Sequence, residues 1–394
     1  MPTQQKGLSL TRQLTQIQPF TGLVLWQDSP HRSTDAISLE YSYLGYNQLI
    51  KGKDKYDWSA LEKLLDSIAH RKHQAIIRLY DTYVGKPTTV PGYIKSLPDY
   101  KETKGRSEGK HTSFPDWSHP EWQRCTLAFF EKLAARYDSD PRLAFLQVGF
   151  GLWAEYHLYD GPFALGKTFP TKAFQTRFLR HQNALWKTTP WMLSIDAADD
   201  ESTPFAAEKS LLALNFGLFD DSFLCKSHST ENAKNWRFFG EERWRSSPRG
   251  GELSYYTDSD QKEALAPSGP HGTRFETLAR RFHLSFMIAN DQPEHQPMTR
   301  FREASQALGY RFHVEKLLAT PAGLEITVRN PGIAPLYYDA YFAVGSTRSS
   351  TSLKGLCAGE TRLCRVPGVV EAKTLQIACD ALVPGQKIEF SAAL

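Results

Sequence analysis

The sequence predicts an α/β fold, a barrel of eight parallel strands and eight helices, followed by a small antiparallel β-sandwich. Two observations predict the barrel: eight short apolar runs recur along most of the chain, and amphipathic segments lie between several of them. The third observation is a change near residue 308, after which the apolar pieces become shorter and turn residues separate them. We therefore expect a barrel domain over residues 1–308 and an immunoglobulin-like sandwich over residues 309–394.

The eight apolar runs are mostly continuous rather than alternating, which is typical of strands that are covered on both faces. In chain order the expected strands are Thr21–Trp26, Ile37–Leu44, Ala75–Tyr80, Ala144–Phe150, Trp191–Ile195, Leu211–Phe216, Gly250–Tyr255 and His283–Ala289. Strands that alternate with helices form parallel sheets with right-handed crossovers, and eight of them close into a (β/α)8, or TIM, barrel.

The expected helices lie between these runs. Trp58–Arg71 carries apolar residues at a spacing of three and four, which is one face of a helix. Pro120–Tyr137 opens with a proline and repeats the pattern, and Thr171–Trp186 and Gly272–Arg281 show a similar period. No clear helix lies between the first two runs or directly after Ile195, so we expect the barrel to be irregular there.

The expected strands of the second domain are short and evenly spaced. They are Phe312–Leu318, Gly323–Asn330, Ala340–Val344, Thr361–Val366, Thr374–Ala378 and Lys387–Ser391. Such spacing, with turn residues between the strands, is typical of an antiparallel sandwich. In the first domain, the loop Val84–His119 is long and rich in Pro, Gly, Lys and Ser, which is typical of a functional or mobile loop.

The composition is that of an ordinary globular protein. The chain has 394 residues, with 47 Lys and Arg and 43 Asp and Glu, which gives a net charge of +4. So small a basic excess argues against a nucleic-acid-binding protein. No apolar run is long enough for a membrane span. The first 18 residues lack the apolar core of a signal peptide, so we expect a cytoplasmic protein, or a periplasmic or secreted one whose export signal has been removed.

The five cysteines are an odd number, so at least one thiol is free or pairs outside the chain. Cys357, Cys364 and Cys379 lie near the C-terminus and could include one disulfide. The alternative, which we favour, is that the cysteines are small buried apolar side chains. No spacing of Cys and His residues indicates a zinc site.

In a parallel barrel, functional side chains lie at the carboxyl ends of the strands. Polar and aromatic residues occur at that end of most of the expected strands. They are Arg78 and Asp81 at the third strand, Trp153, Glu155, Tyr156 and His157 after the fourth, Asp196 after the fifth, Asp220 and Asp221 after the sixth, Glu252 and Tyr255 at the seventh, and Asn290 after the eighth.

Glu155 and Glu252 are the candidate catalytic pair. Cleavage of a glycosidic bond needs one carboxyl group that donates a proton to the leaving oxygen, and an ionised one that attacks the sugar or activates water. Apolar and aromatic residues surround Glu155 in the sequence GFGLWAEYH, and desolvation raises the pKa of a carboxyl group, as an acid requires. Gly250 and Gly251 precede Glu252 and leave room for a ligand. The alternative is that both glutamates only bind loop amides or arginines.

The other candidate residues would bind a carbohydrate substrate. The rings expected to stack on sugar faces are those of Trp26, Trp153, Tyr156 and Tyr255. The residues expected to position hydroxyl groups or tune charge are Arg78, Asp81, His157, Asp196, Asp221 and Asn290, and Arg78 is also expected to keep Glu252 ionised. Core packing of the rings and a structural role for His157 are the alternatives.

The sequence predicts neither a metal nor an organic cofactor. Asp220 and Asp221, together with Asp196, are an alternative metal cluster, but no regular ligand spacing supports it. A helix cap or a role in binding hydroxyl groups is the simpler interpretation of these aspartates.

Several of these segments resemble a bacterial family of barrel proteins of undefined activity, in which a β-sandwich follows the barrel. The resemblance covers the chain from about residue 20 and is carried by Gly149–His157 (GFGLWAEYH), Asn215–Phe223 (NFGLFDDSF), the Gly250-Gly251-Glu252 motif and Asn290. More broadly, the chain resembles the clan A glycoside hydrolases, including the β-galactosidase-like branch.

That broader resemblance implies an acid/base glutamate after the fourth strand and a nucleophile at the end of the seventh, which are Glu155 and Glu252 here. One position departs from the clan pattern, because Ala154 stands where an asparagine normally precedes the acid/base residue. This departure puts the retaining mechanism in doubt.

We therefore expect a glycoside hydrolase that cleaves a β-linked poly- or oligosaccharide by paired-carboxylate catalysis, with retention of configuration. A carbohydrate-binding protein without catalysis and a metal-dependent hydrolase are the alternatives. The sequence leaves the oligomeric state open.

Overall fold

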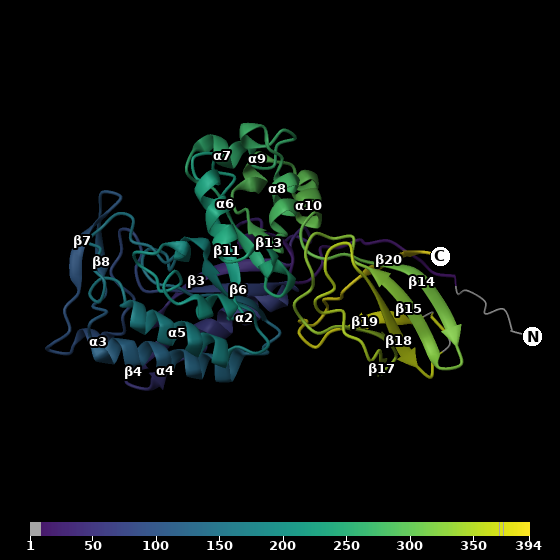
Figure 1. Ribbon diagram of the computed structural model, residues 1–394, viewed down its shortest axis with the longest axis horizontal. Helices are drawn as coiled ribbons and strands as arrows, with labels where there is room; N and C mark the ends of the chain where they lie inside the picture. Colours follow the sequence, from purple (N-terminus) through teal and green to yellow (C-terminus); the bar gives the residue numbers. More distant parts are fainter. Residues whose placement is uncertain (1–8, 370, 373) are drawn as a thin grey trace, which may run out of the picture. The chain divides into compact units, whose positions relative to one another are not determined.

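The structure is a computed structural model that describes residues 9–369, 371–372 and 374–394 (Figure 1). Eight strands form a closed barrel in the order β2-β3-β6-β9-β10-β11-β12-β13. Neighbouring barrel strands pair in parallel, for example Ile77 with Leu146 and Met192 with Gly217. The predicted eight-stranded barrel is confirmed.

Seven of the eight barrel strands lie where the apolar runs predict them. The eight strands are β2 (Gly22–Trp26), β3 (Leu39–Gly45), β6 (Gln74–Tyr80), β9 (Leu143–Gln147), β10 (Trp191–Ser194), β11 (Gly217–Phe223), β12 (Arg249–Leu253) and β13 (Phe286–Ile288).

The sixth predicted strand, Leu211–Phe216, is wrong. The first half of this run belongs to the 3-10 helix η2 (Lys209–Ala213), in which only Leu211 is buried. The strand is β11, which follows it and carries Asp220 and Asp221. The run LLAL is apolar because it is one turn of helix next to the core, whereas two adjacent aspartates interrupt the apolar pattern of the true strand.

The helices of more than five residues are α2 (Ser59–His70), α4 (Pro120–Tyr137), α5 (Lys172–Leu185), α6 (Ser229–Phe238), α7 (Asp258–Glu263), α8 (Phe275–Phe282) and α10 (Met298–Gln306). The sequence predicts α2, α4, α5 and α8. Helices α4 and α5 pack together, with the rings of Phe130 and Phe178 5.3 Å apart (Figure 1).

The chain divides into two compact units. Unit 1 consists of Met1–Glu40, Ala69–Gln74 and Trp244–Leu394, and unit 2 of Tyr41–Ile68 and Ala75–Arg243. Of the barrel strands, β2, β12 and β13 belong to unit 1, and β9, β10 and β11 belong to unit 2. Strand β6 belongs to unit 2 except for its first residue, Gln74, and β3 is divided between the units after Glu40. The domain boundary at residue 308 stays a prediction.

The C-terminal part of unit 1 contains two β-sheets. One has the order β1-β20-β14-β15-β18 and the other β17-β16-β19. Phe342 of one sheet and Phe390 of the other place their rings 5.5 Å apart, so the sheets pack on each other as a sandwich. The strands are β1 (Thr11–Arg12), β14 (Phe312–Thr320), β15 (Gly323–Arg329), β16 (Tyr341–Val344), β17 (Thr347–Arg348), β18 (Thr361–Pro367), β19 (Leu375–Ala378) and β20 (Phe390–Ala393). All pairings within these sheets are antiparallel except that of β14 with β20.

Within the long loop Val84–His119, β7 (Thr103–Ser107) and β8 (Lys110–Phe114) form an antiparallel hairpin (Figure 1). All five cysteines are free thiols, so the buried apolar interpretation is confirmed for four of them, and Cys379 is half-buried. None of the described helices combines the length and the apolar character that a bilayer crossing requires.

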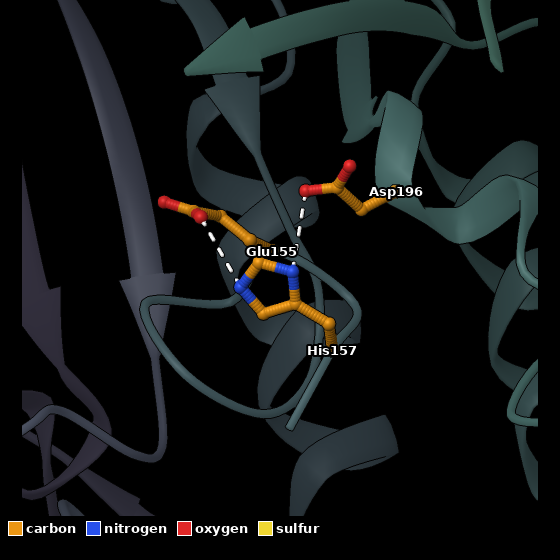
Figure 2. Close-up of side chains that lie close together, drawn as sticks. All are labelled: Glu155, His157 and Asp196. Atoms are coloured by element: carbon orange, nitrogen blue, oxygen red, sulfur yellow. Dashed lines mark ion pairs between the residues drawn. The ribbon is translucent and has the colours of Figure 1, made fainter. Parts of the chain in front are cut away.

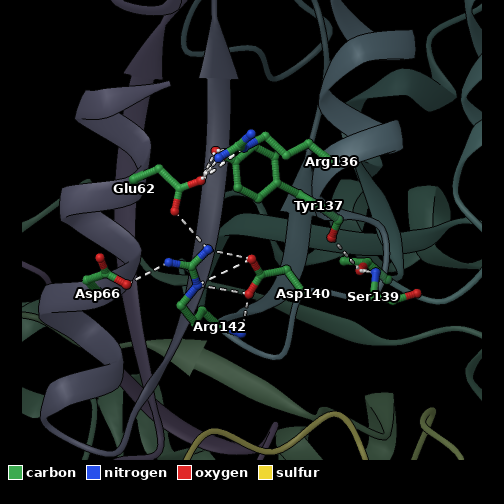
Figure 3. Close-up of polar contacts among 8 residues, drawn as sticks. Glu62, Asp66, Arg136, Tyr137, Ser139, Asp140 and Arg142 are labelled. Carbon is green, nitrogen blue, oxygen red and sulfur yellow. Dashed lines mark hydrogen bonds and ion pairs between the residues drawn. The ribbon is translucent and has the colours of Figure 1, made fainter. Parts of the chain in front are cut away.

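A charged network joins α2 to the turn before β9. Arg142 contacts Asp140 at 2.6 Å, Asp66 at 2.6 Å and Glu62 at 2.9 Å (Figure 3). Burial alone would raise the pKa of Glu62, but hydrogen bonds from Arg136, Tyr137 and Arg142 outweigh burial and hold that pKa below its ordinary value. Ionised Glu62 therefore stabilises the fold through these contacts.

We predict that Arg142→Met lowers the free energy of unfolding by about 1–2 kcal/mol at pH 7, because Glu62 and Asp140 keep their partial burial and lose their shared cation. Since the folded-state pKa of Glu62 is lowered, its stabilising effect is present above the unfolded pKa of about 4.3 and is lost as pH falls through the folded value. Urea unfolding at pH 7 and pH 3 measures both effects, and the difference between variant and wild type should shrink at pH 3. The control is Arg180→Met, which breaks the exposed pair with Glu208 and should cost less than about 0.5 kcal/mol.

Candidate active site

Glu155 lies on a tightly folded loop that follows β9. Trp153, Ala154 and Tyr156 have φ angles of 52°, 61° and 63°, in the left-handed region that side chains other than glycine rarely adopt. Backbone hydrogen bonds hold the loop: the amide of Trp153 donates to Thr82 O and that of Tyr156 to Phe150 O. Strained backbone of this kind is typical of functional sites, where the surrounding structure imposes a conformation that presents a side chain.

Two glycines make the tight fold of this loop possible. A Cβ at Gly149 would lie 1.9 Å from Ala154 O, and one at Gly151 would lie 2.2 Å from His157 O. Gly151 also has a φ of 78°. Any side chain at either position would push the segment that carries Glu155 and His157 out of place.

Arg78 is fully buried near the end of β6 and holds the carboxyl groups around it. Its Nε donates to Gln147 Oε1 at 2.7 Å, from the residue that pairs with it on β9. One terminal nitrogen donates to Tyr43 Oη and to Glu155 Oε1, both at 3.1 Å. The other terminal nitrogen lies 2.6 Å from Asp221 Oδ2. Arg78 therefore binds one oxygen from each of two carboxyl groups.

The carboxyl group of Glu155, whose side chain is 14% exposed, has a pKa raised well above its ordinary value. Burial is the largest cause, and the negative charge of Asp221 is the second. The guanidinium of Arg78 acts in the opposite direction, and the charge of Asp196 adds to the increase. Glu155 therefore keeps its proton more easily than an ordinary glutamate does.

His157 lies between Glu155 and Asp196, as Figure 2 shows. Its Nε2 is 3.4 Å from Glu155 Oε2, and its Nδ1 is 3.3 Å from Asp196 Oδ2. Asp196 lies in the first turn of the 3-10 helix η1 (Ile195–Ala198), whose N-terminal residue Ser194 accepts the amide of Asp196 at 3.1 Å. The fourth and fifth barrel strands thus bring three polar side chains together.

Asp220 faces away from this cluster. Its Oδ1 accepts from the amide of Ser222 at 3.0 Å and from Asn232 Nδ2 at 2.9 Å, and Trp236 Nε1 donates to its Oδ2 at 3.2 Å. Burial raises the pKa of Asp220 to about 7. Asp220 anchors α6 to β11, so the alternative metal cluster of Asp196, Asp220 and Asp221 is wrong.

Half-exposed aromatic rings of unit 2 adjoin Arg78 and Glu155. Tyr43 meets Tyr80 and Tyr83 at ring distances of 5.6 and 5.8 Å. Trp153 meets Tyr83 at 6.1 Å and stacks on the exposed ring of Tyr159 at 6.1 Å. The sequence analysis missed Tyr43 and Tyr83 as site residues, although Tyr43 lies at the carboxyl end of the second strand, where functional side chains are expected.

The remaining predicted site residues lie in unit 1. Glu252 is half-buried on β12, opposite Ile288 of β13. Partial burial of its ring and the charges of Glu252 and Asp291 raise the pKa of Tyr255, which is 50% exposed. Asn290 Oδ1 accepts the amide of Trp26 at 3.1 Å. These contacts bring Glu252 near Tyr255 and Trp26 near Asn290, while the role of each in catalysis or binding stays a prediction.

Three predicted roles need correction. Tyr156 is 0% exposed and packs on Phe150 at a ring distance of 5.3 Å, so it offers no face to a sugar. Asp81 is also buried and accepts from Trp117 Nε1 at 3.1 Å, so it positions that ring rather than a substrate hydroxyl. Arg78, expected beside Glu252, pairs with Glu155 and Asp221.

Comparison with known proteins gives structural likeness only. No protein-family model matches the chain, and no curated protein matches its sequence. Among solved structures, GH5_18 from Bifidobacterium longum subsp. longum is 9% identical, with a TM-score of 0.45 over 73% of this chain and 78% of that chain. The catalytic domain of a beta-amylase from Paenibacillus polymyxa is 9% identical, with a TM-score of 0.43 over 69% of this chain and 91% of that chain.

An alpha-galactosidase from Thermus thermophilus is 14% identical to this chain, with a TM-score of 0.43 over 80% of this chain and 66% of that chain. At this identity and TM-score, the likeness carries no information about the chemistry of this chain, which rests on its own residues.

Proposed function

We propose that this protein is a glycoside hydrolase that cleaves a β-linked poly- or oligosaccharide, with Glu155 as the proton donor. The observation that carries the proposal is the raised pKa of Glu155, a partly buried carboxyl group next to Asp221 and Arg78. Departure of an alkoxide from a sugar carbon needs such a group, because the leaving oxygen must be protonated as the bond breaks.

In this mechanism Glu155 gives its proton to the glycosidic oxygen and becomes a carboxylate. Arg78 then stabilises the new negative charge, since its terminal nitrogen is 3.1 Å from Glu155 Oε1. Asp221 acts before that step, because its negative charge keeps the proton on Glu155. The cluster therefore supports both the protonated state that begins the reaction and the ionised state that ends it.

Asp221 does not suit the role of the second catalytic carboxylate. Glycosidases separate their two carboxyl groups by about 5–5.5 Å for retention or about 6.5–9.5 Å for inversion, so that the sugar or a water molecule fits between them. Glu155 and Asp221 instead bind adjacent nitrogens of one guanidinium, at 3.1 and 2.6 Å. Glu252 stays the predicted nucleophile, on the basis of its place at the seventh strand.

The aromatic rings near Glu155 support a carbohydrate as the substrate class. Trp153, Tyr83 and Tyr159 offer partly exposed ring faces, and the flat C–H faces of sugars pack well on such rings. The same rings would also suit a protein that binds sugars without cleaving them. Turnover of a defined substrate separates these two functions.

The first test is hydrolysis of a panel of β-linked oligosaccharides and aryl β-glycosides by the wild-type chain and by Glu155→Gln. We predict that Glu155→Gln lowers kcat/KM by 10²–10⁴-fold on oligosaccharides, because their leaving groups need a proton. The nitrophenolate of a nitrophenyl glycoside leaves without protonation, so the variant should lose much less activity on these substrates. Equal loss on both substrate types would contradict an acid role for Glu155, and binding without turnover by the wild type would favour the non-catalytic alternative.

The second test uses the charge of Asp221. Since Glu155 must be protonated, activity should fall as pH rises through its raised pKa. We predict that Asp221→Asn moves this alkaline limb of kcat/KM to lower pH, because it removes a negative charge that raises the pKa of Glu155. The control Asp66→Asn, at an exposed position in the Arg142 network, should leave the pH profile in place. A limb that stays at the wild-type pH in Asp221→Asn would rule out Glu155 as the titrating acid.

A further inference from the structure

We propose that Glu155, His157 and Asp196 bind a divalent first-row transition-metal ion, of the range from Mn²⁺ to Zn²⁺. The binding itself is independent of the proposed function, and only its effect on hydrolysis rests on that function. Each of the three residues offers one ligand atom, and no two of these atoms are more than 4.8 Å apart (Figure 2).

The distances within the cluster suit coordination better than hydrogen bonding. The contact of His157 Nε2 with Glu155 Oε2, at 3.4 Å, is longer than an ordinary N–H···O hydrogen bond of about 2.7–3.2 Å, while Asp196 contacts the other ring nitrogen, Nδ1. Two ligands that bind one tetrahedral ion at about 2.0–2.2 Å lie about 3.3–3.6 Å apart. His157 Nε2 and Glu155 Oε2 already have this spacing, and the carboxylate of Asp196 must turn inward to complete the set.

A buried atom without a partner provides a second, independent indication of a ligand. His157 Nε2 is buried and has no hydrogen-bond partner among the described residues. Such atoms lose free energy unless a proton, a water molecule or a metal ion satisfies them.

The charge balance of the cluster favours a divalent ion. Glu155 and Asp221 contact the guanidinium of Arg78, and Asp196 is a third carboxyl group whose charge acts on Glu155. When all three are ionised, two negative charges are left uncompensated, as many as a divalent cation neutralises. Two protons achieve the same balance when no ion is bound.

The two oxygens of the Glu155 carboxyl group have different neighbours. The guanidinium contacts Glu155 Oε1, whereas His157 contacts Oε2. The Glu155 carboxylate would thus contact the guanidinium of Arg78 with one oxygen and the metal ion with the other. One imidazole nitrogen with carboxylate oxygens suits transition ions, while Mg²⁺ and Ca²⁺ prefer oxygen ligands alone.

Metal and proton compete for the same carboxyl group. Because Glu155 binds the ion only after it loses its proton, binding should release a proton and become tighter as pH rises. If Glu155 is the acid of a glycoside hydrolase, the bound ion removes the proton that the reaction needs. Binding of the ion would then inhibit hydrolysis.

The experiment titrates the purified full-length chain with Co²⁺, followed by visible absorption, and with Zn²⁺, followed by calorimetry, at pH 6 and pH 8. We expect one ion per chain, proton release in weak buffer, and tighter binding at pH 8. His157→Gln and Asp196→Asn should each weaken binding at least tenfold. The matched control is His181→Gln, because His181 also lies near a carboxylate, 3.6 Å from Glu131, and belongs to no such cluster among the described residues.

Circular dichroism confirms that each variant is folded, and Asp196→Asn still tests the site if His157→Gln does not fold. Absence of Co²⁺ bands and of heat at millimolar ion overturns the proposal. So does binding that neither variant weakens, or equally strong binding of Mg²⁺ and Ca²⁺. These readouts use no substrate, so a metal site without glycosidase activity and a glycosidase without a metal site are distinguishable outcomes.

Discussion

The buried guanidinium of Arg78 is the constraint on which the candidate site depends. A charged group inside a protein is tolerated only when partners satisfy its donors, since desolvation otherwise costs several kcal/mol. Gln147, Tyr43, Glu155 and Asp221 meet that need, from three barrel strands and the loop after β9. The rings of Phe219 and Tyr43, with centroids 4.2 and 5.3 Å from its central carbon, complete the enclosure.

This arrangement explains how two acidic side chains with different behaviour occur side by side. Asp221 has the shorter contact with Arg78, at 2.6 Å. Glu155 is at 3.1 Å and also feels the charge of Asp196, so burial and repulsion dominate its titration. Different environments at neighbouring carboxyl groups are how proteins obtain an acid and an anion at one pH.

The sequence was sufficient to predict the barrel and part of the site. Continuous apolar runs marked the strands, and the strand-end rule selected Arg78, Glu155, His157, Asp196 and Asp221. The strand prediction failed at β11, because Asp220 and Asp221 interrupt its apolar pattern. The prediction that Tyr156 binds a sugar failed because its ring is part of the core. Apolar neighbours predicted the raised pKa of Glu155, but the contributions of Asp221 and Asp196 come from contacts distant in sequence, which no local pattern contains.

The side chains of Asp220 and Asp221, at adjacent positions on β11, point to opposite sides of the strand. Asp220 reaches Asn232 and Trp236 of α6, while Asp221 reaches Arg78 of β6. Because successive side chains alternate, the insertion of one residue within the strand would exchange these two acids. Asp220 would then face the guanidinium of Arg78, and Asp221 would lie under α6. Changes in length during evolution should therefore be confined to the loops at either end of this strand, and natural variation in this segment should consist of replacements alone.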